Sequence, residues 1–464
     1  MNITELLRGR GMWDSSSFVP LSEVKTQEDK KALEEQGYLP GYTVSEWEQT
    51  YDIPAQYIYY DNGNFAPETY YYDPDNAAVP IVLRLMLFGR NLIHPKGNDI
   101  DAYCKSIKQT AESLRGNPTP NTVFSYLVSL DNSMRIKALC HYVAYSQPSA
   151  ELYTRFKDLY LGTDYGFSHI DIDVMKKVVG GKTEAQKRET QARLQSLPDT
   201  VTVYRGQSGA STPLDKTFSW TPDINTAYFF ACRLDTSNAS IVSAQVKKEN
   251  IIEVFEDSEP EYWIFPEHII EPETLELISP SGDEVSPFRY IEEYWEYRDI
   301  ICGLYEDEDS ECHDALHSAR VLFLALAIVQ AGNIELTAQE LESLCRACAW
   351  HDVGRTNDCV DPSHGKKSKN IFVKEYPNDK VAAFAITYHS IDDETAEQDL
   401  YLYGKMTASQ KKSAKLIYTI LKDADALDRV RFGLRDLDVN FLRLDISKRM
   451  VAVAQAALHS IKIN

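Results

Sequence analysis

Five of the ten histidines of this 464-residue chain lie between residues 313 and 425, in company with two aspartates that suit the same chemistry. The set comprises His313, His317, the adjacent pair His351-Asp352, His364, His389 and Asp425. Imidazole and carboxylate ligands together suit Mn, Fe, Ni, Co or Zn better than an all-oxygen site does. A cation held by such ligands can make hydroxide from water near neutral pH, and a phosphate ester is the natural substrate for that reaction.

The elements that must position these residues are predicted to be helices. His313 and His317 are four residues apart at the head of a segment with helical apolar periodicity, so both imidazoles are expected on one face. The capping box Thr337-x-x-Glu340 opens a second helix, which is expected to deliver His351-Asp352 at its end. A second capping box, Thr407-x-x-Gln410, opens a later helix that leads to the last aspartate of the set.

This stretch resembles the HD-domain metal-dependent phosphohydrolases, whose pattern is a first His, then His-Asp, then a distant Asp. The resemblance is carried by H-x-x-R-V (317–321), HDVGR (351–355), NDCVDPSHGKKS (357–368) and DADALD (423–428). One position differs from many members, because Arg355 stands where they have Lys.

The resemblance implies a role for each member of the set. It makes His317, His351, Asp352 and Asp425 metal ligands, His364 and His389 candidates for a second metal, and His313 a substrate or proton-transfer residue. The implied cofactor is a divalent metal: Mn, Fe, Ni, Co, Zn or Mg. A lone buried histidine more often satisfies a core hydrogen bond than a metal, so the interpretation rests on the whole set in this order.

Two thiols fall inside the second predicted helix. Cys345 and Cys348 have CxxC spacing, but a zinc ribbon needs a knuckle turn and a second cysteine pair. We therefore predict that these two thiols pack within the helix bundle. The eight cysteines of the chain are scattered, which favours reduced thiols over a disulfide framework.

A second constellation precedes the first. Residues 201–209 alternate like a short strand that ends in Arg205 and two glycines, which indicate a tight turn. Residues 218–221 are predicted to end another strand, and Asp223 or Asn225 to start a helix. Residues 241–246 alternate like a half-buried strand.

Two glutamates follow these elements. Glu259 and Glu261 are two residues apart, which is expected to place both on one side of an extended chain. The residue between them is Pro260, which lacks a backbone donor, so this strand is expected at a sheet edge or a bulge.

Arginine, then Ser-x-Thr, then Glu-x-Glu is the order found in arginine-type ADP-ribosyltransferases, and residues 201–270 resemble their catalytic core. The resemblance implies that Arg205 grips the NAD pyrophosphate, with Gly206, Ser219 and Thr221 also lining the NAD site. Glu261 would hold the nicotinamide ribose and stabilise the oxocarbenium ion as nicotinamide leaves.

The same resemblance assigns the acceptor side of the reaction. Ser219 would orient Glu261, and Glu259 would take a proton from the attacking nucleophile, which is usually an arginine side chain in relatives. The gap between Arg205 and Ser219 is short for the family. Taken singly, these residues are better explained as a surface charge, a helix start and a solvated strand face, so the interpretation rests on their order and their strand-helix-strand context.

The predicted fold class is α+β. Along the chain, a helical N-terminal lobe is expected first, then an ADP-ribosyltransferase-like split β-sheet core, and then an all-α HD domain. The predicted parts are an aromatic-rich region (1–80), a helical lobe (81–200), the transferase core (201–278), a linker (279–300) and the HD domain (301–464). Within the lobe, helices are expected near 99–115, 120–146 and 150–161, and after the Thr183-x-x-Gln186 capping box. The tyrosines at 57–60 and 70–72 fit either internal packing or a recognition surface, and packing is favoured.

Charge and hydropathy bound the partners. A net charge of −22 argues against nucleic acid and anionic membranes and favours a basic or arginine-bearing protein substrate. No apolar stretch is long enough to span a bilayer, and the start lacks a signal-peptide pattern. Synthesis in a cytoplasm is expected, with export into a host or target cell left open to a system that reads other signals.

The combined prediction is an NAD-dependent protein mono-ADP-ribosyltransferase with an HD phosphodiesterase that processes the ADP-ribose adduct. A similar pairing, in the opposite domain order, occurs in SidE-type bacterial effectors, which makes a secreted bacterial effector or toxin a reasonable biological setting. One alternative is a nucleotide phosphohydrolase, acting on a dNTP or an alarmone, with a degenerate transferase-like sensor. A second is a binding protein whose two sites are relics.

Overall fold

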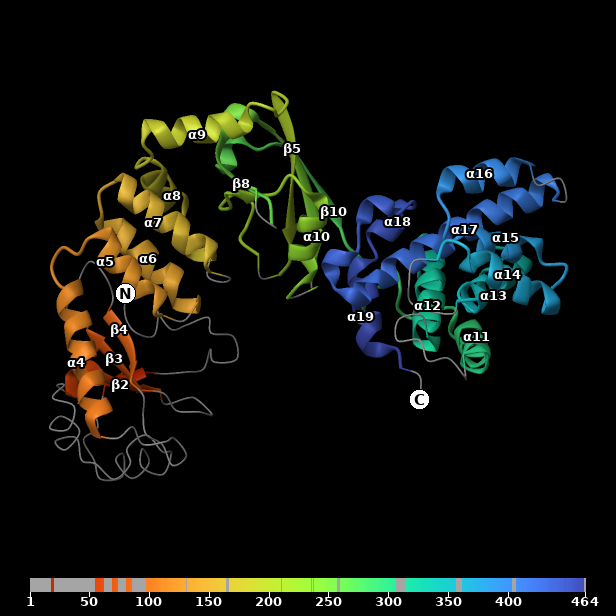
Figure 1. The fold of residues 1–464 in the computed structure, drawn as a ribbon, viewed down its shortest axis with the longest axis horizontal. Helices are drawn as coiled ribbons and strands as arrows, with labels where there is room; N and C mark the ends of the chain where they lie inside the picture. The colour runs from red at the N-terminus through yellow and green to blue at the C-terminus, as the bar shows by residue number, and fades with distance from the viewer. Residues whose placement is uncertain are drawn as a thin grey trace. The chain divides into compact units, whose positions relative to one another are not determined.

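The computed structural model divides the chain into two compact units, residues 1–195 with 212–217 and residues 196–211 with 218–464. It describes residues 18–20, 55–61, 69–73, 81–85, 97–130, 132–163, 167–209, 211–234, 236, 238–256, 259–305, 314–355, 361–402 and 406–462 (Figure 1). The two units are taken in turn.

The first unit opens with a four-stranded antiparallel sheet in the order β1-β2-β3-β4. Its strands are β1 (Phe18–Pro20), β2 (Ile58–Asp61), β3 (Thr69–Asp73) and β4 (Ile81–Leu85), and η2 (Ala55–Tyr57) precedes β2. Tyr72 is buried and its ring meets that of Tyr59 edge to face at 5.4 Å, so these two tyrosines pack internally. Residues 81–85, predicted to belong to a helical region, instead extend this sheet.

Apart from connecting segments, the remaining described residues of the first unit form helices. They are α4 (Gly97–Leu114), α5 (Pro120–Val128), α6 (Asn132–Tyr145), α7 (Ala150–Leu161), η3 (Phe167–His169), α8 (Ile172–Val179) and α9 (Glu184–Leu194). The capping box at Thr183 is present as predicted. The single helix expected over 120–146 is two helices, α5 and α6. The Ser129 hydroxyl donates to the Tyr126 carbonyl oxygen, and the Arg135 guanidinium donates to the carbonyl oxygens of Val128 and Leu130 just after α5. These bonds satisfy backbone acceptors where α5 ends.

The second unit begins with two small antiparallel sheets. One has the order β10-β7-β5, from β5 (Thr200–Gln207), β7 (Ser240–Lys247) and β10 (Ile270–Glu276). The other has the order β6-β9-β8, from β6 (Ser219–Trp220), β8 (Ile251–Phe255) and β9 (Glu261–Ile264). Tyr204 and Thr221 bridge the two sheets, and the turns η4 (Lys248–Asn250) and η5 (Pro266–His268) flank β8 and β9.

Helix α10 (Ile224–Cys232) packs on β5. Its N-cap is Asp223, whose carboxylate accepts from the backbone amides of Asn225 and Thr226. A Cβ at Gly206 would stand 2.0 Å from the Ala227 carbonyl oxygen, so only glycine lets β5 approach this helix so closely.

The proline between the two glutamates has a different effect from the one predicted. Strand β9 is the middle strand of its sheet and not an edge. Pro260 directly precedes the strand, which starts at Glu261, so its missing amide breaks no ladder bond.

The remainder of the second unit is helical (Figure 1). The α-helices are α11 (Ile291–Leu304), α12 (Ala315–Ala331), α13 (Ala338–Trp350), α14 (His364–Glu375), α15 (Lys380–Tyr388), α16 (Asp393–Leu402), α17 (Ala408–Leu427), α18 (Asp445–Lys448) and α19 (Val451–Ser460). The short turns η6 (Asp428–Phe432), η7 (Leu434–Asp436) and η8 (Val439–Phe441) follow α17. Both predicted capping boxes, at Thr337 and Thr407, open their helices. Helix α12 is buried along most of its length and packs against α11, α13, α17 and α19.

One hydrophobic core runs through the second unit. Ala227 and Ala231 of α10 and Ile241 of β7 belong to the same buried cluster as the side chains of α12, α13, α15, α17 and α19. Residues 291–300, assigned from sequence to a linker, form the first part of α11, which buries Tyr294 and Tyr297 against this core. The described architecture is therefore α+β with small antiparallel sheets and a helical C-terminal region.

Among the helices of the described ranges, none combines the length and the hydrophobicity that a membrane span requires.

Candidate metal centre

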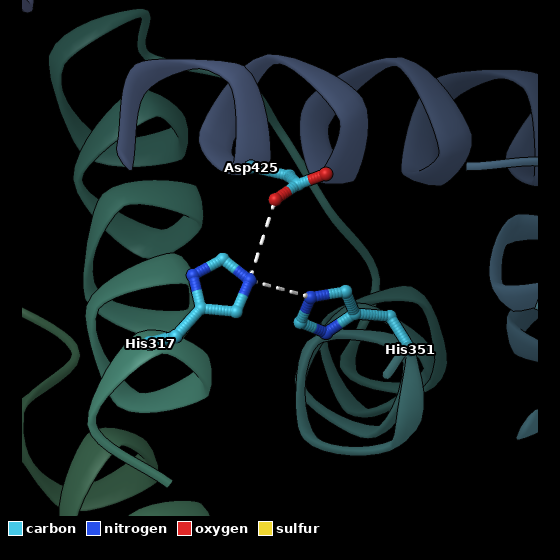
Figure 2. A group of neighbouring side chains, drawn as sticks. All are labelled: His317, His351 and Asp425. Atoms are coloured by element: carbon cyan, nitrogen blue, oxygen red, sulfur yellow. Dashed lines mark hydrogen bonds and ion pairs between the residues drawn. The ribbon is translucent and has the colours of Figure 1, made fainter. Parts of the chain in front are cut away.

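Three helices of the second unit carry the first group of candidate ligands (Figure 2). His317 lies in the first turn of α12, where the N-cap Asp314 accepts its backbone amide at 2.8 Å. His351 is the C-cap residue of α13, and Asp425 lies in the last turn of α17. Their side chains point toward one another: His317 Nε2 stands 3.2 Å from His351 Nε2 and 3.4 Å from Asp425 Oδ1.

A second group lies against the first. It contains Asp352, His364, which is the first residue of α14, and His389, which is the C-cap residue of α15. His364 Nε2 and His389 Nε2 are 2.8 Å apart, and Asp352 Oδ1 lies 3.0 Å from the first and 3.3 Å from the second.

The Asp352 carboxylate joins the two groups. Its Oδ1 faces His364 and His389, whereas its Oδ2 lies 3.6 Å from His317 Nε2 and 3.8 Å from His351 Nε2. One carboxylate therefore offers one oxygen to each group, which is the arrangement needed to bridge two neighbouring cations.

The far nitrogen of every imidazole has its own acceptor. The Nδ1 atoms of His351, His364 and His389 lie 2.8, 2.5 and 2.8 Å from the carbonyl oxygens of Cys348, Asp361 and Ile386, and Nδ1 of His317 lies 2.8 Å from Asp428 Oδ2. The tautomer that satisfies all four bonds carries its proton on Nδ1 and turns the Nε2 lone pair inward.

Such convergence of lone pairs requires positive charge. With every Nδ1 protonated, the two short Nε2 to Nε2 contacts set acceptor against acceptor, beside carboxylates that also only accept. Divalent cations match this donor set in type and in number, with three donors for each group. The residues present therefore fit one or two metal ions.

Helix ends add to the attraction for cations. His351 and His389 cap the C-termini of α13 and α15, where the helix dipole is negative. Burial opposes ionisation of Asp352 and Asp425, but the surrounding histidines outweigh it and hold the pKa of both carboxyls below its usual range. Burial alone would lower the pKa of His317, yet the hydrogen bonds that its ring donates to Asp425 and Asp428 raise it to about 9, so without a cation a proton on His317 supplies the positive charge. Burial lowers the pKa of His351 to about 4.

An outer group of charges holds His317 in place. Asp428 is fully buried and receives Arg320 Nε at 2.6 Å and Arg431 Nη1 at 3.1 Å in addition to the His317 imidazole. Its pKa stays below the usual value, because hydrogen bonds from His317 and Arg320 outweigh the effect of burial.

Sequence reasoning quoted Arg320 and Asp428 inside motifs but gave them no role. The available signal was spacing, since Arg320 is one helical turn after His317 and Asp428 one turn after Asp425.

A cavity of about 230 Å³ opens onto the second group. Its walls include Asp352, His364, His389 and Asp425, together with Arg355 and Ser390. Arg355 Nε lies 3.5 Å from Asp352 Oδ2, so a guanidinium stands at the edge of the ligand cluster and faces the same cavity.

Two further predictions concern this half. His313 lies outside the described residues, so its proposed role stays a prediction. Cys345 and Cys348 are buried in α13, and burial raises the pKa of Cys345 to about 12 and raises that of Cys348 well above its usual value. They are packed thiols, as predicted, and no thiolate ligand arises from them.

The transferase-like residues are partly brought together. Arg205, on β5, donates from Nη1 to the Ser219 carbonyl oxygen at 2.7 Å. Thr221 and Tyr204 exchange backbone hydrogen bonds of 2.7 and 2.9 Å, which joins the strand of Arg205 to that of Ser219. Glu261 begins β9 next to Tyr262, the residue that pairs with Trp220 of β6. Arg205, Gly206, Ser219, Thr221 and Glu261 thus come from strands that are directly bonded or bridged.

The prediction that Glu259 and Glu261 lie on the same side of one strand is wrong. It lies in a bend before Pro260, outside β9, and its carboxylate pairs with the guanidinium of Arg435 from η7. The bend at Glu259 breaks the extended geometry that the two-residue spacing presupposed.

Comparison with known proteins adds no relative to this description: no family model, no curated protein and no solved structure matches the chain.

Proposed function

We propose that the helical part of the second unit is a metal-dependent phosphohydrolase centre acting on a phosphate ester. The observation that carries the proposal is the convergence of six donor atoms in two groups joined by the Asp352 carboxylate. A buried, fully oriented set of this kind is costly unless a cation compensates it.

The chain's own residues divide the work. His317, His351 and Asp425 would hold one cation, His364 and His389 a second, and Asp352 both. A divalent cation bound there supplies Lewis acidity toward a phosphoryl oxygen and toward water. Arg355 would receive a substrate phosphate at the cavity mouth, because its planar guanidinium can bind two phosphate oxygens.

The test is hydrolysis of bis(p-nitrophenyl) phosphate and of a nucleotide panel by protein loaded with Mn, Fe, Ni, Co, Zn or Mg. We expect turnover with at least one metal and its loss in Asp352→Asn, with bound metal counted by mass spectrometry. Metal-free protein that retains full turnover would contradict the proposal.

We further propose NAD-dependent ADP-ribosyl transfer at the β5–β6–β9 site, supported by the bond from Arg205 to Ser219 and by Glu261 at the start of the adjoining strand. Arg205 would grip the pyrophosphate through its remaining donors, and Glu261 would stabilise the ribose cation as nicotinamide leaves. A basic or arginine-bearing protein is the proposed acceptor.

The transferase test is peptide mass spectrometry of a lysate incubated with NAD and protein, with Glu261→Gln as the matched control. An adduct that needs Glu261 supports the transferase. If the metal centre trims the same adduct, wild-type protein leaves phosphoribose and Asp352→Asn leaves whole ADP-ribose. Nucleotide hydrolysis that survives Glu261→Gln, with no adduct in either protein, would favour the alternative of a phosphohydrolase with a degenerate transferase-like region.

A further inference from the structure

The carboxylate proposed to face the acceptor already holds a guanidinium from the same chain. Arg435 Nη2 contacts Glu259 Oε1, although 176 residues separate the two in sequence. An arginine acceptor would present the same group to the same carboxylate.

Aromatic packing fixes the guanidinium further. The Arg435 guanidinium carbon lies 4.2 Å from the ring centre of Phe229, on α10. The side chains of Arg435 and Glu259 remain 47% and 42% exposed, so an electrophile from solvent can reach the pair.

Other contacts anchor the segment that carries Arg435. Arg429 Nε donates to the Asp436 carbonyl oxygen at 3.0 Å. The Asn225 side chain donates to Asp438 Oδ1 and accepts the Val439 amide, both at 2.9 Å, which ties the segment to the start of α10. An exposed ion pair alone is weak evidence, but here backbone and aromatic contacts fix the Arg435 side of the pair.

We propose that Arg435 is a built-in acceptor that this chain ADP-ribosylates on itself; the inference rests on the proposed transferase function. A guanidino nitrogen of Arg435 forms a bond to C1′ of the nicotinamide ribose while the bond from C1′ to nicotinamide breaks. Nicotinamide leaves with that electron pair, and Glu259 takes the proton released from the guanidinium.

The experiment incubates purified full-length protein with NAD, with and without agmatine, a free guanidinium acceptor, and maps adducts by peptide mass spectrometry. We expect ADP-ribose or its phosphoribosyl remnant on the Arg435 peptide, absent from Arg435→Lys and from Glu261→Gln. Arg233→Lys is the matched control, because Arg233 also lies over aromatic rings of α10, at 4.5 Å from Phe230; its Arg435 adduct should persist.

The outcomes distinguish failure of the self-modification from failure of the transferase function. Agmatine modified by wild-type protein while Arg435 stays unmodified overturns the self-modification and leaves the transferase standing. An adduct on the Arg435 peptide that persists in Glu261→Gln also overturns it, because a chemical reaction with NAD would then be its source. No adduct on agmatine, on Arg435 or on any lysate protein overturns both.

Discussion

The metal centre and the transferase-like site differ in how their residues are held. In the metal centre each imidazole has a second partner that fixes it, either a helix-end carbonyl or Asp428, and nearly all the ligands are buried. In the transferase-like site Arg205, Ser219 and Glu261 are half-buried, and Glu259 is held by another part of the chain. The candidate ligands of the first site already converge on two points, whereas the second site presents more widely separated groups.

The two regions also treat buried carboxylates in opposite ways. Histidines keep the pKa of Asp352 and Asp425 low, whereas burial raises the pKa of Glu253, in strand β8 of the second sheet, to about 7. Charge is stabilised in one region and penalised in the other, so the two regions should respond differently to mutation and to pH.

The largest effect is expected from Asp352→Asn, which keeps the size of the side chain but removes the bridging charge. Bound metal and phosphoesterase activity should fall by at least about 100-fold, because losing even an indirect ligand contact costs about 10–100-fold. Asp445→Asn, at an exposed carboxylate of α18, is the control and should keep both. Unchanged metal content in Asp352→Asn would remove the contrast between the regions.

A smaller effect is expected from Asp428→Asn, which weakens the hold on His317 without touching a cation. Metal affinity should drop about 10–100-fold in a calorimetric titration, as for other residues that orient a ligand. Asp436→Asn, in the neighbouring turn η7, should leave the affinity alone. Unchanged metal affinity in Asp428→Asn would mean that the hydrogen bond to Asp428 is not needed to orient His317.

In the transferase-like site, Arg205→Lys tests whether a guanidinium is required. Lysine cannot hold the Ser219 carbonyl and a pyrophosphate in the same planar geometry. NAD affinity should fall about tenfold, the value of one charge-assisted hydrogen bond. Equilibrium binding of NAD measures it, with Arg233→Lys as the control; equal affinity in both variants would argue against a pyrophosphate contact.

The smallest effect is expected from Glu253→Gln and depends on pH. The folded protein favours the neutral carboxyl, so its contribution to stability is full below pH 4.5 and is lost as pH rises through about 7. Glu253→Gln should therefore gain stability over wild type at pH 8 but not at pH 4.5. We expect about 1–2 kcal/mol, since local relaxation and water penetration reduce the cost of a buried charge.

Thermal unfolding of both proteins at the two pH values measures this difference, and subtracting wild type removes the titration of the metal centre. A constant difference between pH 4.5 and 8 would show that Glu253 ionises normally in the folded protein.

The sequence anticipated which candidate ligands lie together because helix periodicity and caps are local signals. The capping boxes at Thr337 and Thr407 fixed where α13 and α17 start, and histidines at helix ends then had few directions in which to point. Asp428 was given no role because its partners, His317 and Arg320, are more than 100 residues away. Its spacing of one turn from Asp425 places it near a candidate ligand but does not identify those partners.

The strand predictions located β5, β6 and β7 but missed that Glu259 lies outside β9 and pairs with Arg435. The position of Pro260 relative to the start of β9 decides that, together with a partner at Arg435, and neither follows from two-residue spacing. Likewise, alternation at 81–85 was too short to distinguish a strand from the helical pattern that follows it.

The shared hydrophobic core of α10, β7 and the C-terminal helices has a thermodynamic consequence. Because Ala227 and Ile241 pack into the same interior as α12 and α17, residues 196–464 should melt in a single cooperative transition. Linkage then makes either ligand a stabiliser of the whole unit, so a metal bound at one end should raise the melting temperature of the strands at the other.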